Sequence, residues 1–172
     1  MTEKKNNQER CSDCGRACDA DEIRIIDGQG VCFKCLCGDA EPITIRPIGI
    51  VINDKKRAKG NFGMTGSDVS EIRLHPEQER FMKALADETH LMIIWHLHQA
   101  GPIRTVFNRG WDGKEVGPFA SRTPDRLTPI AVTDVELIEV RGTTLIVRGL
   151  DAIDGTPVLD IKVSKKSLKR SG

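Results

Sequence analysis

Apolar residues run together, or alternate with polar ones, in several short stretches of the chain. These stretches are rich in β-branched residues and lie at 42–52, 69–74, 89–98, 130–140 and 145–150. Short apolar or alternating runs bounded by proline, glycine and polar residues are typical of β-strands. Strands this closely spaced predict a mainly β domain, a barrel or a sandwich, over residues 42–163.

One segment has helical rather than strand spacing. A short helix is expected from Pro76 to about Asp87, because proline suits a first helical turn and acidic residues follow near its positive end. Its apolar face is predicted to comprise Phe81, Met82 and Leu85.

The six cysteines of the chain all lie near its beginning. Cys11 and Cys14 form one C-x2-C pair, and Cys32 and Cys35 form a second, a spacing typical of tetrahedral zinc sites. Each pair aims two thiolates at one point, and the metal replaces a core too small to fold alone. Between the pairs, residues 22–26 read as a strand followed by a turn at Asp27-Gly28. We therefore predict a metal-binding module at 11–41, with a structural Zn²⁺ ion.

Other readings of this module stay open from the sequence. Cys18 and Cys37 remain outside the two pairs, so either could substitute as a ligand or be a free thiol. An iron–sulfur cluster and redox-active thiols are the alternatives to zinc. The module could contact RNA or a partner, or it could serve only stability or a dimer contact.

Composition narrows the classes of partner. The 26 basic and 25 acidic residues leave a net charge of +1, so nucleic acid would have to be contacted by local patches. Aromatic residues are 4% of the chain and tyrosine is absent, which disfavours a broad base-stacking platform. No apolar run has the length of a membrane span and the first residues lack the apolar core of a signal peptide, so a cytoplasmic protein without membrane association is expected.

Each of two charged segments has a structural and a functional interpretation. The loop 53–66 carries Lys55, Lys56, Arg57 and Lys59, and it is either a solvated loop or a phosphate contact. Residues 164–172 form a basic tail that is either frayed or able to grasp phosphate. Residues 1–10 are polar and are predicted to be a disordered lead-in.

Two polar loops beside apolar runs carry the candidate chemistry. The first reads Gly-Pro-Phe-Ala-Ser-Arg-Thr-Pro-Asp-Arg from Gly117, and the second reads Asp-Ala-Ile-Asp-Gly-Thr-Pro-Val-Leu-Asp-Ile-Lys from Asp151. Their prolines and glycines fix the backbone, so their polar side chains are aimed. By themselves, these arginines, aspartates and hydroxyls fit a polar, partly anionic ligand such as a nucleotide.

These two loops resemble the motifs of the TrmO family of tRNA methyltransferases, the TsaA-like β-barrel group. The family pattern G-x-F-A-T-R-S-x-x-R-P-N-P-I-G is matched loosely from Gly117. The pattern D-x-x-D-G-T-P-V-x-D-I-K-P is matched from Asp151 to Lys162, with Val163 in place of the last proline. The resemblance covers about 42–163 and implies a TsaA-like β-barrel. It also implies S-adenosylmethionine as cofactor, tRNA as substrate, a homodimer, and methylation of N6 of threonylcarbamoyladenosine beside the anticodon.

The same resemblance implies roles for the loop residues. Arg122 and Arg126 would orient anionic groups of the modified base or a phosphate; both are candidate cofactor-binding residues, and Arg122 is also a candidate catalytic residue, as is Asp154. Asp151 and Asp154 would accept hydrogen bonds from a ribose or an amino group, or help to take the proton of the nitrogen. Gly155 and Thr156 would shape the adenosine pocket. The alternative for the Asp154-Gly-Thr-Pro segment is a tight turn held by an aspartate side chain.

The strand at 89–98 also resembles a family element, S-H-x-W-x-x-x-x-F-H. His90 and His98 stand in matching places, and His90 is a candidate catalytic residue. The alternative is a hydrogen-bonded structural histidine, since His90, His96 and His98 would share one face of a strand.

Departures from the family pattern keep two other functions open. Leu127, Thr128 and Ala131 replace Pro, Asn and Gly, and residues 53–66 lack a Pro-Arg-Gln segment. A methyltransferase of the same family with a different substrate, or a binding module without catalysis, would explain these changes.

Overall fold

The computed structural model describes residues 8–56 and 68–168, and these fall into two compact units. One unit comprises the described residues within Met1–Thr44 and Gln99–Pro129, and the other comprises those within Ile45–His98 and Ile130–Gly172. Residues 99–129, which lie within the predicted barrel domain at 42–163, are grouped with the cysteine module in this division. Within the described residues, no helix is long and apolar enough to cross a membrane.

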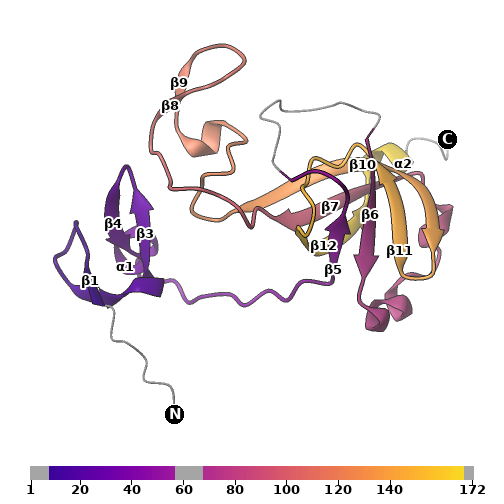
Figure 1. Cartoon of the computed structure of the whole chain (residues 1–172), viewed down its shortest axis with the longest axis horizontal. Coiled ribbons are helices and arrows are strands. Elements are labelled where there is room, and N and C mark those ends of the chain that lie inside the picture. The colour runs from indigo at the N-terminus through magenta and orange to yellow at the C-terminus, as the bar shows by residue number, and fades with distance from the viewer. Residues whose placement is uncertain (1–7, 57–67, 169–172) are drawn as a thin grey trace. The chain divides into compact units, whose positions relative to one another are not determined.

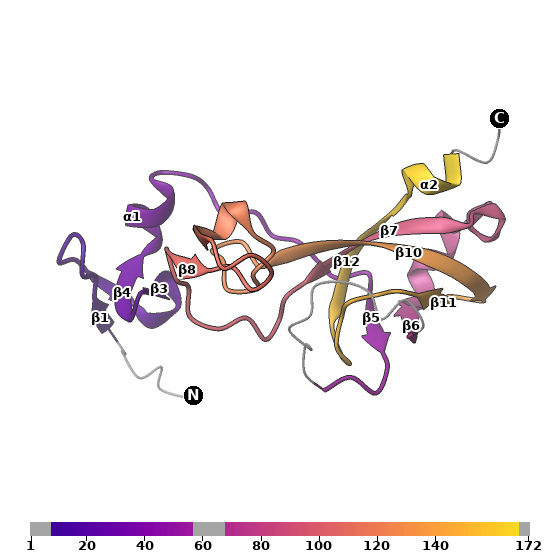
Figure 2. The same cartoon turned by 90° about the horizontal axis from the view of Figure 1, so that it is seen from above.

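The second unit is a closed barrel of antiparallel strands in the order β10-β11-β6-β5-β12-β7. Figures 1 and 2 both show β10 running beside β7. The predicted mainly β barrel is confirmed. The strands are β5 (Gly49–Ile52), β6 (Val69–Leu74), β7 (His90–His96), β10 (Ile130–Arg141), β11 (Thr144–Arg148) and β12 (Pro157–Val163).

The alternation of apolar and polar residues fills the interior of the barrel. In β7, Leu91, Ile93 and Trp95 point inward and are buried, whereas the residues between them are only half-buried. The other fully buried side chains of this core include Val51, Ile72, Leu145, Val147 and Val158.

The predicted strand over 42–52 is shorter than expected. It begins only at Gly49, and Ile43 is 86% exposed. A Cβ atom at Gly49 would lie 2.4 Å from the carbonyl oxygen of Arg73, so β5 reaches β6 this closely only because the residue is glycine. Strand β5 therefore begins at Gly49, the residue that lies closest against β6.

The predicted short helix over 76–87 is present as two shorter helices rather than one. The segment forms two 3-10 helices, η2 (Pro76–Phe81) and η3 (Leu85–Asp87). Ala84 between them has a φ of 63°, in the left-handed region that no continuous helix can include. Met82 and Leu85 pack on the barrel core as predicted, but Phe81 is 75% exposed.

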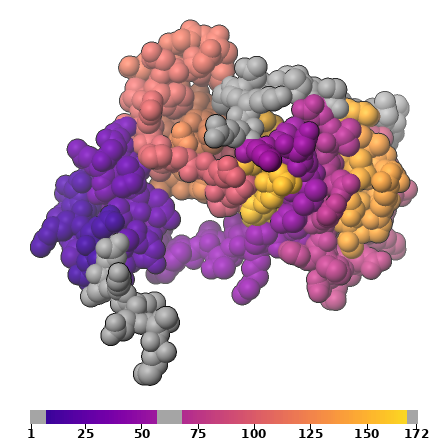
Figure 3. All heavy atoms as spheres, in the orientation of Figure 1, coloured from indigo at the N-terminus to yellow at the C-terminus, as the bar shows by residue number. Residues whose placement is uncertain are grey.

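The first unit is built from short paired strands. The predicted strand and turn near 22–28 are confirmed by β3 (Ile23–Ile26) and β4 (Gln29–Cys32), which form a hairpin followed by α1 (Phe33–Cys37). The other elements are β1 (Gln8–Arg10), β2 (Ala17–Asp19), η1 (Ala20–Glu22), β8 (Phe107–Asn108), β9 (Glu115–Val116) and η4 (Pro118–Ala120). In Figure 3 the indigo atoms of the cysteine module form one small body.

The described residues near both ends of the chain form elements that the sequence does not predict. Residues 8–10 of the predicted lead-in pair with β2 as strand β1, and residues 1–7 lie outside the described part. The basic tail, expected either to be frayed or to grasp phosphate, contains helix α2 (Lys165–Leu168), while 169–172 lie outside the described part. Ser164 and Ser167 are buried, and the Ser167 hydroxyl accepts hydrogen bonds from the backbone N–H groups of Thr89 and His90.

Candidate functional site

The four cysteines of the two pairs lie together in the first unit. The sulfur atoms of Cys11, Cys14, Cys32 and Cys35 are all within 4.8 Å of one another. Four sulfurs at about 2.3 Å from a tetrahedral centre lie about 3.8 Å apart. The Cys11–Cys35 and Cys14–Cys32 sulfur distances are 3.8 and 3.9 Å, so the residues fit a tetrahedral metal ion.

The electrostatics of this cluster also suit a cation. The N–H of Cys32 points at the Cys11 sulfur at 3.3 Å, and such backbone hydrogen bonds lower the pKa of Cys11 to about 6. Hydrogen bonds from Cys14 and Cys32, with burial and the charge of Cys11, raise the pKa of Cys35. Four crowded thiolates cannot all ionise without a cation among them. Cys18 and Cys37 lie outside the cluster.

The Asp154-Gly155-Thr156 turn lies at one end of the barrel and is joined to the end of β5. The Asp154 carboxylate accepts a hydrogen bond from the N–H of Asn53 at 3.0 Å. The N–H of Gly155 donates to the Val51 carbonyl at 2.8 Å, and Gly155 has the positive φ, 73°, that the turn requires. The turn is therefore held by a strand about a hundred residues earlier in the chain.

Asn53 is the centre of this arrangement, and the sequence analysis missed it. Its side-chain amide donates to the Ser70 hydroxyl and the Ala152 carbonyl, both at 3.0 Å. Its side-chain oxygen accepts from the N–H of Lys55 at 3.0 Å. Its position as the first polar residue after an apolar strand was the available signal.

Lys55 and Asp151 are charged neighbours at the same end of the barrel. Lys55, predicted to lie in a solvated or phosphate-binding loop, is half-buried and pairs with Asp68 at 3.2 Å and the Leu150 carbonyl at 3.2 Å. The Asp151 carboxylate has no hydrogen bond within the described part of the chain. Crowding by protein raises its pKa even though the residue keeps an exposed surface, and the charge of Lys55 opposes this shift. Among the described residues, Asp151 thus has no hydrogen-bond partner.

The side chain of Thr156 is fully buried. Its hydroxyl lies 3.4 Å from Nδ1 of His98, which is exposed just beyond the end of β7. Thr156 therefore supports His98 from inside the barrel, and the residue that reaches solvent here is the histidine.

His90 lies at the other end of β7. Strand β7 separates it from His96 by six residues, which is roughly 20 Å at about 3.3 Å per residue. The Nδ1 atom of His90 lies 3.1 Å from the Thr89 hydroxyl, and its backbone is bound by Ser167. The structure does not bring His90 together with the Asp154 turn.

Arg122 and Arg126 belong to the first unit, and they differ in what they contact. The Arg126 guanidinium donates to the carbonyls of Pro118, Ser121 and Thr123 at 2.9–3.1 Å, so it holds its own loop together. Arg122 is exposed and makes no hydrogen bond or ion pair with any described residue. Its guanidinium is available to an anion.

Arg109 also holds this loop, and the sequence analysis missed it. It lies over the Trp111 ring with 4.4 Å to the centroid, forms an ion pair with Asp112 and donates to the Ala120 carbonyl at 3.0 Å. Between the carbonyls held by Arg109 and Arg126, Phe119 is 96% exposed. A turn fixed on both sides thus presents an aromatic ring and Arg122 to solvent.

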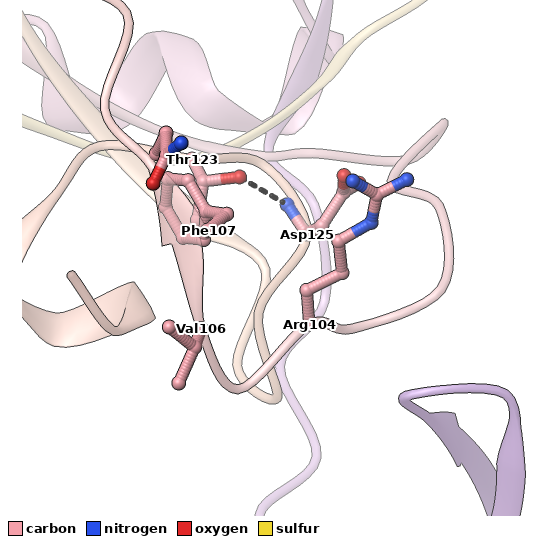
Figure 4. A pocket seen from close by; sticks show the side chains of 6 residues that line it. Arg104, Val106, Phe107, Thr123 and Asp125 are labelled. Carbon is pink, nitrogen blue, oxygen red and sulfur yellow. Dashed lines mark hydrogen bonds between the residues drawn. The ribbon is translucent and has the colours of Figure 1, made fainter. Parts of the chain in front are cut away.

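A hollow of about 560 Å³ lies beside this loop (Figure 4). Arg104, Val106, Phe107 and Asn108 come from one segment, and Thr123 and Asp125 come from the loop; the N–H of Asp125 donates to the Thr123 hydroxyl at 3.3 Å. The hollow combines apolar and charged side chains.

Comparison with known proteins shows similarity to a tRNA-methyltransferase domain and to probable S-adenosyl-L-methionine-binding proteins. The sequence signature described as the tRNA-methyltransferase O N-terminal domain matches residues 55–167. A probable S-adenosyl-L-methionine-binding protein of Methanothermobacter thermautotrophicus is 40% identical over 126 residues, covering 70% of this chain and 88% of that protein.

Other relatives have names of the same two kinds. A probable S-adenosyl-L-methionine-binding protein of Archaeoglobus fulgidus is 34% identical, covering 76% of this chain and 36% of that protein. A tRNA (adenine(37)-N6)-methyltransferase of Mus musculus is 34% identical, covering 49% of this chain and 20% of that protein. A crystal structure of TrmO from Pseudomonas aeruginosa matches with a TM-score of 0.55 at 24% identity, covering 72% of this chain and 56% of that one, which shows the shared fold.

Proposed function

The chain belongs to the tRNA-methyltransferase O N-terminal domain family, and from this premise we propose that it is an S-adenosylmethionine-dependent tRNA methyltransferase. We propose that it methylates N6 of threonylcarbamoyladenosine beside the anticodon. The names of relatives support this proposal: some are probable S-adenosyl-L-methionine-binding proteins and others are tRNA (adenine(37)-N6)-methyltransferases.

The observation that carries the proposal is the construction of the Asp151–Thr156 segment. The barrel holds this turn by the Asn53–Asp154 and Val51–Gly155 hydrogen bonds, and no described residue donates a hydrogen bond to the Asp151 carboxylate. A preorganised, unpaired carboxylate suits a cationic ligand because no internal partner must be displaced.

Each residue then has a defined task. Asp151 binds a positive group of the cofactor, and Arg122 binds an anionic group of the modified base or a phosphate of the tRNA. Asp154 and Arg126 hold the two loops, and Gly155 and Thr156 shape the wall near His98. The bound cofactor supplies a methyl group already activated by its sulfonium, so the chain mainly has to align the reacting groups.

His90 is left out of this set. It lies at the opposite end of β7 from the Asp154 turn and is bonded to Thr89 and Ser167. Those contacts support the structural alternative for this histidine.

We also propose a structural zinc ion at Cys11, Cys14, Cys32 and Cys35, because their sulfur distances fit a tetrahedral ion. A homodimer and a cytoplasmic location accompany the proposal. The exposed Val132 on β10, beside Ile94 of β7, offers apolar surface for a dimer contact.

A methyl-transfer assay tests the function. Labelled S-adenosylmethionine is supplied with tRNA that carries threonylcarbamoyladenosine and with the same tRNA lacking that modification. We expect label only in the modified tRNA, loss of transfer in Arg122→Ala, and wild-type transfer in Arg46→Ala, which removes another exposed arginine. Transfer to the unmodified tRNA would identify a different substrate, and cofactor binding without any transfer would favour a binding module.

A further inference from the structure

One segment of the first unit lies between the cysteine module and the Arg122 loop. The turn of the β3–β4 hairpin is made by Asp27 and Gly28, which have φ values of 48° and 82°. The Ile26–Ile103 bridge joins this hairpin to the following segment, and Asp27 and Ile25 exchange backbone hydrogen bonds with Ile103 at 2.9 and 3.0 Å.

The Asp27 carboxylate completes this junction. Its two oxygens accept from the N–H and the hydroxyl of Thr105 at 3.0 and 2.5 Å. These hydrogen bonds, with the charge of Arg104, lower the pKa of Asp27. Both donors of one residue are thus satisfied by one carboxylate 78 positions earlier in the chain.

The other side of the same segment contacts the Arg122 loop. The N–H of Gly101 donates to the Asp125 carboxylate at 2.7 Å. A Cβ atom at Gly117 would lie 3.2 Å from the Thr105 carbonyl oxygen, so the start of the loop lies directly against Thr105. Strand β8 then pairs with β9, which leads into the loop.

The cysteine module can hold this junction only if it is itself folded. Its buried core contains just Cys11, Cys18, Ile23, Val31 and Cys32, and two of these are members of the four-cysteine cluster. Cys32 also ends β4, so a metal ion at the cluster fixes the base of the hairpin whose turn is Asp27. A core this small depends on its metal for stability.

We propose that the metal-binding module orders the Arg122 loop through the Asp27–Thr105 contact, and that Asp27 is a positioning residue for the reaction. The family signature begins at residue 55 and therefore does not include the cysteine module. The proposal gives that module a task. It rests on the proposed function only in its consequence for tRNA, because the physical coupling can be measured without activity.

The test is hydrogen–deuterium exchange on the full chain, with metal bound and after chelation. In the wild type, chelation should speed exchange of the backbone amides at 101–105 and 118–126 about tenfold or more. Thr105→Ala, with metal bound, should speed the same amides while residues 11–35 stay protected and metal content stays at wild type. Chelation of the metal from the Thr105→Ala variant should then cause little further increase in amide exchange at 118–126.

Two variants separate positioning from general damage. Thr105→Ser keeps both donors and should restore wild-type exchange, whereas Asp27→Asn tolerates the left-handed turn but loses one acceptor and should behave like Thr105→Ala. Unchanged exchange at 118–126 after chelation of the wild type, or in Thr105→Ala, would overturn the proposal.

Kinetics show the consequence. Thr105→Ala should raise KM for tRNA about tenfold with kcat and cofactor affinity unchanged, and Thr105→Ser should restore KM. A wild-type KM in Thr105→Ala would overturn the positioning role. If the wild type transfers no methyl group at all, the proposed function fails, and the exchange data alone decide the coupling.

Discussion

Asp154 and Asn53 are joined by a hydrogen bond of 3.0 Å from the Asn53 N–H to the Asp154 carboxylate, although 101 positions separate them in the chain. A second hydrogen bond in this region runs from the Asp154 N–H to the Lys55 carbonyl at 2.9 Å. The aspartate of the Asp-Gly-Thr-Pro turn is therefore fixed by the end of strand β5. Its neighbour Asp151 has no such partner within the described residues, so the two aspartates should respond differently to substitution.

Asp154→Ala should lower the free energy of unfolding by about 1–3 kcal/mol, because it leaves the Asn53 N–H without its charged acceptor. Asp154→Asn keeps an acceptor oxygen and should lose less than half as much. Urea denaturation of the full chain measures both. Equal stability of wild type and Asp154→Ala would show that the hydrogen bond contributes nothing.

Asp151→Asn should leave the fold intact and weaken S-adenosylmethionine binding at least about tenfold, since it removes a charge facing a cation. Calorimetric titration measures the affinity. The matched control is Asp13→Asn, an exposed carboxylate in the cysteine module. Wild-type affinity in Asp151→Asn would remove this residue from the proposed site.

The raised pKa of Asp151 also predicts a pH dependence of stability. The folded chain holds this proton more tightly than the unfolded chain, so the free energy of unfolding should fall as pH rises from the ordinary carboxyl range through the raised pKa. Asp151→Asn removes that cost. The variant should have a higher urea midpoint than the wild type at pH 7 and the same midpoint at pH 3; the opposite order at pH 7 would contradict the assignment.

Arg126→Lys should loosen the Arg122 loop without unfolding the unit, because an ammonium group cannot reproduce the guanidinium contacts to three carbonyls. Limited proteolysis at the loop should be faster than in the wild type, whereas Arg122→Lys should be cut at the wild-type rate. If both variants were cut equally slowly, Arg126 would not be the group that holds the loop.

Cys11→Ser and Cys35→Ser should each release the metal and abolish the fold of residues 11–41. Cys37→Ser should keep a full equivalent of metal, because Cys37 is exposed and outside the cluster. Elemental analysis of the purified variants gives the content. Zinc in the wild type is expected, and a visible absorption band would indicate an iron–sulfur cluster instead.

The sequence predicts those parts of the fold that depend on neighbouring residues. The runs at 69–74, 130–140 and 145–150 are confirmed as strands, and the C-x2-C spacing brings four cysteines together. Over 76–87 the sequence predicts one helix, whereas left-handed Ala84 divides the segment into two 3-10 helices. Backbone conformation at one residue decided that outcome, and no residue type signalled it.

Contacts between distant residues are what the sequence pattern could not supply. Asn53 has no motif around it, and its importance comes from Ser70, Ala152 and Asp154, which only the closed barrel brings near. Likewise, the Asp27–Thr105 contact depends on the fold of the first unit. The family motif identified the aspartates and arginines by type, but it could not separate those that hold a loop from those without a partner among the described residues.

The measurement that tests the central claim most directly is calorimetric titration of the metal-replete protein with S-adenosylmethionine. The account predicts micromolar binding that Asp151→Asn weakens strongly and Asp13→Asn leaves unchanged. A folded wild-type protein that takes up no S-adenosylmethionine would contradict it, because the unpaired carboxylate at the Asp154 turn would then serve no cofactor.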